Sequence, residues 1–182
     1  MRTGLIGVAF VLICAGVAPA LAQLENLAPP PGCRAWNADL PKEWEPWGGS
    51  PAPLTAAVTP AGEKDAEVGI GKKLALTLAP AKTVTLEKSM PDIDFDGPKD
   101  PHSGLLSFHV PTDGLYWVAA SGGVWIDIIV NGQIIDPRET DGGPLCASLG
   151  KALQYRLKAG DATIQLVRSR GPHVDLMVAA EP

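Results

Sequence analysis

Hydrophobic and polar residues alternate one by one along most of the chain from residue 54 onward. Six runs show the pattern most clearly: KLALTLAP (73–80), LLSFHVP (105–111), VWIDIIV (124–130), LQYRLKAG (153–160), ATIQLV (162–167) and VDLMVAA (174–180). Successive side chains of a β-strand point to opposite faces, so each run predicts a strand with one buried face.

Turn-forming residues separate these runs. They occur in TDG (112–114), SGG (121–123), NGQ (131–133), DGG (141–143) and KAGD (158–161). Asn131–Gly132 is the kind of pair that two-residue hairpins favour, and a short helical turn is expected only around Leu145–Leu149. The pattern therefore predicts an all-β fold, an antiparallel, jelly-roll-like β-sandwich, and leaves the strand order open.

Residues 23–53 differ from the rest because they are rich in proline and hold three of the five tryptophans. Proline has no backbone donor and a fixed φ, so a long helix or a central strand is excluded there. We expect an irregular arm, held by Cys33 and laid over a sandwich domain of residues 54–182. Trp36, Trp44 and Trp47 would anchor the arm. An exposed aromatic platform for sugar is the alternative.

The first 22 residues have the organisation of a secretory signal peptide. Arg2 precedes an apolar run from Leu5 to Val17, and Ala-Leu-Ala stands before Gln23. The run is too short and too interrupted for a membrane span. We expect cleavage near Ala22, export to the periplasm or outside the cell, and no stable membrane insertion.

The charge of the chain excludes some partners. The net charge is −5, and it becomes −6 once residues 1–22, with one arginine and no acidic residue, are removed. Nucleic-acid binding depends on neutralising phosphates, and this acidic chain has no basic run for that purpose. It also lacks the polybasic patch that anionic membrane surfaces attract.

Two cysteines, Cys33 and Cys146, remain after the expected cleavage. In an oxidising compartment such a pair predicts a disulfide. The bond would close a loop of more than a hundred residues, which chain-entropy models value at roughly 4–5 kcal/mol. A pair of metal thiolates is the alternative, although no further His or Cys ligand lies near either cysteine in the sequence.

A carboxylate interrupts the most apolar run, at Asp127 in VWIDIIV. If Ile126 and Ile128 face the core, then Trp125 and Asp127 share the opposite face. An indole can stack on the C–H face of a sugar while a carboxylate accepts its hydroxyl hydrogens. We therefore name Trp125 and Asp127, with help from Trp117, as candidate ligand-binding residues. In the structural alternative, Trp125 lies under the arm and Asp127 accepts from the backbone or an arginine. Both interpretations place Asp127 at a sheet surface.

An acidic stretch, PDIDFDGPKDPH (91–102), matches the first half of a calcium loop. Asp92, Asp94 and Asp96 precede a glycine, and Asp100 falls at the ninth loop position. Ser103 replaces the usual bidentate glutamate, and flanking prolines exclude the helices of an EF-hand. One interpretation of this stretch is a calcium-stabilised loop. The alternative is a strand whose aspartate side chains face the solvent.

Known catalytic motifs are not found. The sequence has no nucleophile elbow, phosphate loop or dinucleotide fingerprint. The three histidines, His102, His109 and His173, have no compact metal-binding spacing, so a metal site would require the fold to gather them.

From Thr112 onward the chain resembles a group of small exported proteins of proteobacteria. The matching residues are Gly114, Tyr116 and Val118, then Trp125-Ile126-Asp127-Ile128 with Asn131-Gly132, and Gly143-Pro144-Leu145-Cys146 with Lys151. The resemblance covers roughly residues 50–182 and implies a jelly-roll-like sandwich. Proteins of this group often carry the label homogentisate 1,2-dioxygenase, which implies iron. This chain has no H-x-H motif, and the segment directly before its G-P-x-C turn, DPRETDG (136–142), contains no histidine.

Three functions follow from these observations. The first is an exported, non-catalytic β-sandwich that binds a ligand or an envelope component, with carbohydrate as the expected ligand class. The second is a structural subunit of a surface or periplasmic assembly, whose tryptophan arm docks on a neighbour. The third is a metal-dependent, dioxygenase-like enzyme.

Overall fold

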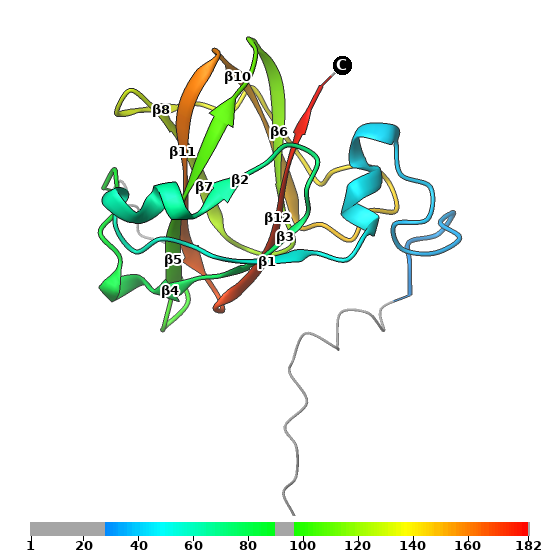
Figure 1. The fold of residues 1–182 in the computed structure, drawn as a ribbon. Helices are drawn as coiled ribbons and strands as arrows, with labels where there is room; N and C mark the ends of the chain where they lie inside the picture. Colours follow the sequence, from blue (N-terminus) through cyan, green and yellow to red (C-terminus); the bar gives the residue numbers. More distant parts are fainter. Residues whose placement is uncertain (1–27, 90–96, 182) are drawn as a thin grey trace, which may run out of the picture.

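Two β-sheets packed face to face make up most of the protein (Figure 1). The structure, a computed structural model, describes residues 28–89 and 97–181. Sheet A contains, in spatial order, β1 (Ala52–Thr55), β3 (Leu74–Thr77), β12 (His173–Ala180), β6 (Gly114–Ala120), β10 (Lys151–Leu157) and β9 (Glu139–Asp141). Sheet B contains β2 (Glu67–Val68), β5 (His102–Val110), β11 (Gly160–Ser169), β7 (Trp125–Val130) and β8 (Gln133–Ile135), with β4 (Ala79–Pro80) also paired to β5. Three short 3-10 helices are described: η2 (Lys42–Gly48), η3 (Pro60–Asp65) and η4 (Ala81–Thr83).

The predicted sandwich is confirmed, but its sheets are mixed rather than purely antiparallel. β1 pairs with β3, and β2 with β5, in the parallel direction. Both are short strands that reach a sheet edge from an irregular segment and not through a hairpin. A parallel partner needs such a crossover connection, and the alternation of side chains carries no information about strand direction.

The core lies between the two sheets and is filled by the alternating apolar positions. Leu76, Phe108, Ile128, Ile164 and Leu176 are all at most 1% exposed within it. These residues come from five different strands, and each belongs to the apolar set of one of the alternating runs. The sequence pattern thus assigns the inward faces correctly.

A buried phenol also lies in this core. The Tyr155 hydroxyl donates to the backbone carbonyl of Ile126 at 3.3 Å. Burial, together with the negative charges of Asp127 and Asp136, raises the pKa of Tyr155 far above its usual range. The phenol therefore stays neutral and links β10 to β7 across the sandwich.

Two turns show how local sequence sets the connections. Asn131 and Gly132 both have positive φ, +50° and +70°, and close the β7–β8 hairpin as predicted. The expected helical turn near Leu145 is instead a single hydrogen-bonded turn, in which the Ala147 N–H donates to the carbonyl of Pro144 at 3.0 Å. Cys146 adopts φ +72° there, a left-handed conformation that does not continue into a helix.

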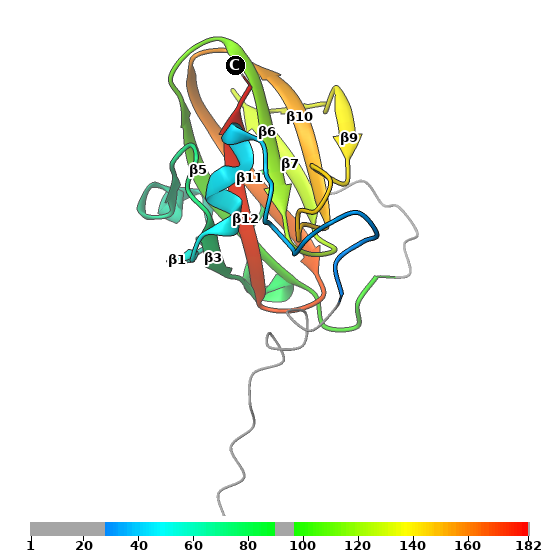
Figure 2. The same ribbon diagram turned by 90° about the vertical axis from the view of Figure 1, so that its right-hand side faces the viewer.

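The proline-rich arm covers the outer face of sheet A. Figure 2 shows η2, in cyan, lying in front of β6 and β12. Trp47 is 0% exposed and Trp44 6% exposed. The surface beneath them consists of Ala119, Ala152, Met177 and Ala179. Small alanine side chains leave room for the two indoles, so this face of sheet A is a second, smaller core. Trp36, which precedes η2 in the arm, is only partly buried.

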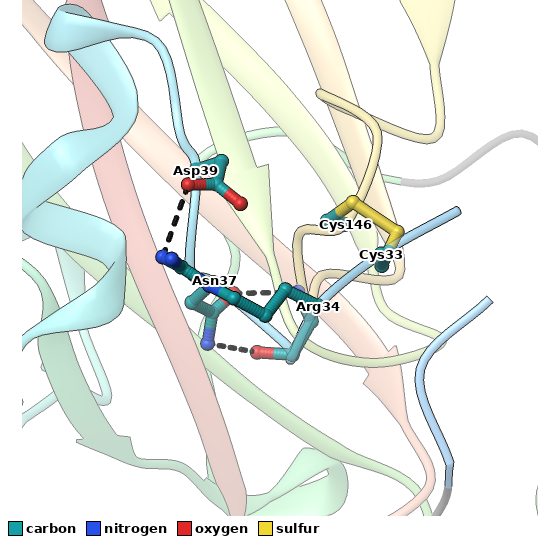
Figure 3. Close-up of a disulfide and its surroundings, with 6 residues drawn as sticks. Cys33, Arg34, Asn37, Asp39 and Cys146 are labelled. Atoms are coloured by element: carbon teal, nitrogen blue, oxygen red, sulfur yellow. Dashed lines mark hydrogen bonds and ion pairs between the residues drawn. A yellow bond between two sulfur atoms is a disulfide. The ribbon is translucent and has the colours of Figure 1, made fainter. Parts of the chain in front are cut away.

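The predicted disulfide joins this arm to the loop between β9 and β10 (Figure 3). Cys33 and Cys146 are bonded, with their Cα atoms 5.6 Å apart. Asn37 strengthens the junction: its backbone N–H donates to the Cys146 carbonyl at 2.7 Å, and its side chain exchanges two hydrogen bonds with Ser148. The arm is therefore held at one end by a covalent bond and at the other by Trp47.

The disulfide indicates an oxidising compartment outside the cytoplasm. Within residues 28–89 and 97–181, no helix is long and apolar enough to cross a membrane. The expected signal peptide, residues 1–22, lies outside the described residues.

Candidate functional site

The outer face of β7 carries Trp125, Asp127 and Ile129, because Ile126 and Ile128 face the core. Trp125 is 37% exposed and is the most exposed of the five tryptophans. Asp127, two positions along the same face, is only 8% exposed. The predicted orientation of both side chains is correct, but other residues cover the carboxylate.

Both oxygens of the Asp127 carboxylate accept hydrogen bonds from neighbouring side chains. The indole Nε1–H of Trp125 donates to Oδ1 at 2.7 Å. The amide Nε2–H of Gln165, directly opposite on β11, donates to Oδ2 at 3.1 Å. A buried carboxylate is tolerated only with such partners, because an unpaired buried charge costs several kcal/mol.

Gln165 is itself fixed in one orientation by a backbone segment. Its Nε2–H also donates to the carbonyl of Lys88 at 3.0 Å, and its Oε1 accepts from the Lys88 N–H at 3.1 Å. Gln165 is 0% exposed, and its amide cannot turn over without losing both backbone bonds. A chain of hydrogen bonds thus runs from Lys88 through Gln165 and Asp127 to the ring of Trp125.

Gln165 is the component that sequence reasoning missed. It is visible as a polar position in the run ATIQLV, but only the β7–β11 register places it opposite Asp127. With this partner, Asp127 acts mainly to orient Trp125, since its acceptor oxygens are already engaged within the chain.

A cation from the other sheet approaches the same indole. Lys151, the first residue of β10, places its Nζ 6.0 Å from the centroid of the Trp125 ring. Burial lowers the pKa of Lys151 from its usual value, because a half-buried ammonium loses part of its hydration. The geometry is at the outer limit of a cation–π contact, so this end of the sandwich presents an indole beside a positive charge.

Trp117 does not join this site. It lies on β6, and its ring centroid is 6.3 Å from that of Trp44 in the arm. It therefore belongs to the cluster on the outer face of sheet A. The structure brings Trp125 and Asp127 together and places Trp117 on the opposite sheet.

A groove of about 270 Å³ lies further along the same face of sheet B. It begins at Ile129, and its lining includes the polar side chains of Glu63, Lys64, Glu87, Ser107, Asn131, Asp161 and Thr163 together with Gly132 and Ala162. The Thr163 hydroxyl donates to Glu63 at 3.0 Å. Burial, and secondarily the nearby charge of Glu87, raises the pKa of Glu63. The groove offers hydrogen-bonding groups and no aromatic surface.

The three histidines considered as metal ligands do not lie together in the structure. His109 Nδ1 donates to the Asp161 carboxylate at 2.8 Å on the surface. His102 and His173 begin strands in different sheets. Among the residues that the structure covers, no three His, Cys, Asp or Glu side chains are grouped so that they could hold a metal.

The predicted calcium loop falls largely outside this part of the chain. Asp92, Asp94 and Asp96 lie outside the described residues, and Asp100 is exposed. Calcium binding stays a prediction, which isothermal titration with calcium checks directly. No heat at millimolar calcium would remove it.

Comparison with models of known protein families and with curated proteins gives no significant match. The resemblance to small exported proteobacterial proteins therefore stays a prediction.

Proposed function

We propose that this chain is an exported, non-catalytic β-sandwich protein that binds carbohydrate on the exposed face of Trp125. The observation that carries the proposal is the hydrogen bond from Trp125 Nε1 to Asp127, itself held by Gln165. A part-exposed indole on a protein surface is ordinarily able to change rotamer. Here the ring plane is fixed before any ligand arrives.

A fixed indole suits sugar recognition for a physical reason. The apolar C–H face of a pyranose stacks on an aromatic ring, and the gain is reduced by any side-chain entropy lost on binding. Because Trp125 is already ordered by Asp127, most of that entropy is lost during folding. The groove beyond Ile129 lies on the same face and supports the proposal, because its lining includes side chains that can hydrogen-bond sugar hydroxyls.

The test is retention on immobilised polysaccharides and binding across a glycan array. Trp125→Ala should abolish binding, and Trp125→Phe should weaken it because the smaller ring has no N–H for Asp127. Leu145→Ala is a matched control, since Leu145 is a 73% exposed apolar residue in the β9–β10 loop. Circular dichroism and thermal unfolding must show that each variant is folded. Equal retention of all four proteins, or no retention of the wild type on any glycan, would contradict the proposal.

A structural role in an envelope assembly is the second candidate. Two of the arm's three tryptophans, Trp44 and Trp47, do not favour docking on a neighbour, because they are buried on the protein's own sheet. The edge strands β8 and β9 carry the relevant surface instead, with Ile134 41% exposed and β9 exposed throughout. Co-purification in a defined complex from envelope fractions, lost in Ile134→Lys, would favour this role.

A dioxygenase-like activity, the third candidate, needs bound iron. Elemental analysis of protein produced in iron-rich medium tests it, and a metal-free product would remove it. Export to the periplasm, or beyond it, is proposed from the signal-peptide pattern together with the disulfide.

A further inference from the structure

Sheet B contains a β-bulge in strand β11, next to the position of Trp125 on the neighbouring strand β7. In the β5–β11 ladder, Leu166 pairs with Gly104 and the next pair is Ser169 with His102. Two residues of β11, Val167 and Arg168, therefore stand opposite the single residue Ser103. Bulges of this kind redirect side chains and occur often beside functional sites.

The register of the neighbouring strands places the bulge next to the indole. Val167 pairs with Trp125 on β7, so Arg168 follows the residue directly opposite Trp125. Arg168 has φ +57°, a left-handed conformation that is unusual for a residue with a side chain. The strained residue therefore lies one position beyond the Trp125–Val167 pair.

Three buried polar atoms at this bulge have no hydrogen-bond partner within the described part of the chain. They are Nη1 of Arg168, Oγ of Ser103 and Nδ1 of His102, and Ser103 is only 1% exposed. Most buried polar atoms in proteins are paired, because leaving a donor unsatisfied is costly, most of all for a charged group. Arg168 is only partly buried, so an anion can approach its guanidinium, which carries a positive charge and can only donate hydrogen bonds.

The charges around Trp125 also favour an anion. Lys151 lies 6.0 Å from its ring centroid, and Arg170 Nε lies 3.9 Å from where a Cβ on Gly123 would stand, two residues before Trp125. Within residues 28–89 and 97–181, no ion pair involves Lys151, Arg168 or Arg170. Asp127 supplies one opposing charge. This positive region stands out in a chain whose net charge is −5.

We propose that the sugar bound at Trp125 is acidic, a hexuronic acid residue whose carboxylate binds the Arg168 guanidinium. Lys151 contributes a second positive charge beside the ring. The planar guanidinium matches a carboxylate with two parallel hydrogen bonds. This inference rests on the proposed function and adds the chemical class of the ligand.

Isothermal titration with three oligosaccharides tests the inference: oligogalacturonate, its methyl ester, and a neutral dextran oligosaccharide of equal length. The wild type should bind oligogalacturonate at least about tenfold more tightly than the methyl ester, the expected effect of one charge-assisted hydrogen bond. Arg168→Gln should remove that preference and leave the affinity for the ester unchanged. Sulfated dextran distinguishes a carboxylate site from a site for any polyanion.

Control variants separate specific recognition from general charge. Lys158→Gln removes an exposed cation that is paired with Asp113, and it should leave the acid-to-ester preference unchanged. If Arg168→Gln does not fold, Arg168→Lys is the second variant: it keeps the positive charge without the planar guanidinium and should lose most of the preference for the acid. Lys151→Gln should reduce that preference only in part.

The outcomes are distinct. Equal wild-type affinity for the acid and the ester, still abolished by Trp125→Ala, overturns the acidic-sugar inference and leaves sugar binding in place. The acidic-sugar inference is also overturned if Lys158→Gln reduces the acid-to-ester preference as much as Arg168→Gln does. It is overturned too if the wild type binds sulfated dextran more tightly than oligogalacturonate. No binding of any of these sugars overturns the inference, and no binding across the whole glycan panel overturns the proposed function as well.

Discussion

Replacing Asp127 by asparagine tests the hydrogen-bond network that fixes Trp125. The substitution keeps the size of the side chain and exchanges one acceptor oxygen for an NH2 group. In either orientation of the new amide, that NH2 faces a donor, the Trp125 indole N–H or the Gln165 amide N–H. Gln165 cannot adapt, because Lys88 holds both ends of its amide.

The expected cost follows from these contacts. One hydrogen bond to a charged acceptor is lost, worth about 1.5–3 kcal/mol, and a buried donor is left facing another donor. Removing a buried charge offsets part of this loss. We expect the free energy of unfolding to fall by about 1–3 kcal/mol, which corresponds to a decrease in Tm of about 2–10 °C for a chain of this size.

Urea unfolding measures the stability, and the indole N–H resonance of Trp125 in a ¹H–¹⁵N spectrum reports the local bond. In the wild type this N–H should exchange slowly with solvent, and in Asp127→Asn it should shift and exchange faster. Asp161→Asn is the matched control, since its carboxylate is 93% exposed and its loss should change stability by less than about 0.5 kcal/mol. Wild-type stability in Asp127→Asn, with the indole N–H still protected, would refute the reasoning.

Three further predictions concern the arm and the surface. Trp47→Ala should lower the free energy of unfolding by about 3–5 kcal/mol in urea melts, because it empties a fully buried site; a loss below about 1 kcal/mol would mean that the arm is not docked. Replacing both Cys33 and Cys146 by serine removes a cross-link across 113 residues, worth about 5 kcal/mol in the chain-entropy model. Calorimetry should show a Tm lower by about 10–20 °C, and an unchanged Tm would contradict this. Hydrogen bonds from Lys158 and from the backbone N–H of Ala159 lower the pKa of Asp113. The ionised Asp113 carboxylate therefore stabilises the fold at neutral pH, and this stabilisation is lost as the pH falls through the lowered pKa. A carboxyl NMR titration should show a low midpoint that rises in Lys158→Met, and an ordinary midpoint in the wild type would argue against the contact.

The faces of the strands could be predicted from the sequence, because the alternation of side chains is a local property of extended backbone. It correctly assigned Phe108, Ile128 and Leu176 to the core. The two parallel edge pairs could not be predicted in this way. Whether β1 runs with or against β3 depends on a connection of many residues and on the neighbours of β3, neither of which changes the local pattern.

The candidate site, like the fold, could be predicted only as far as the faces of its strands. Alternation placed Trp125 and Asp127 on an outer face, but it could not identify the partner that covers the carboxylate. That partner, Gln165, is 38 residues away in sequence, and its own orientation depends on Lys88. Trp117 was grouped with Trp125 because alternation assigns a face within a strand and does not tell which sheet the strand enters.

The most direct test of the central claim is a ligand titration followed at the indole N–H of Trp125. Oligogalacturonate is the probe, and the buried Trp47 indole is the internal reference. The account predicts a saturable shift of the Trp125 resonance, no shift at Trp47, and loss of binding heat in Trp125→Ala. A Trp125 resonance that does not move at saturating sugar, for this probe and for the glycans of the panel, would contradict it.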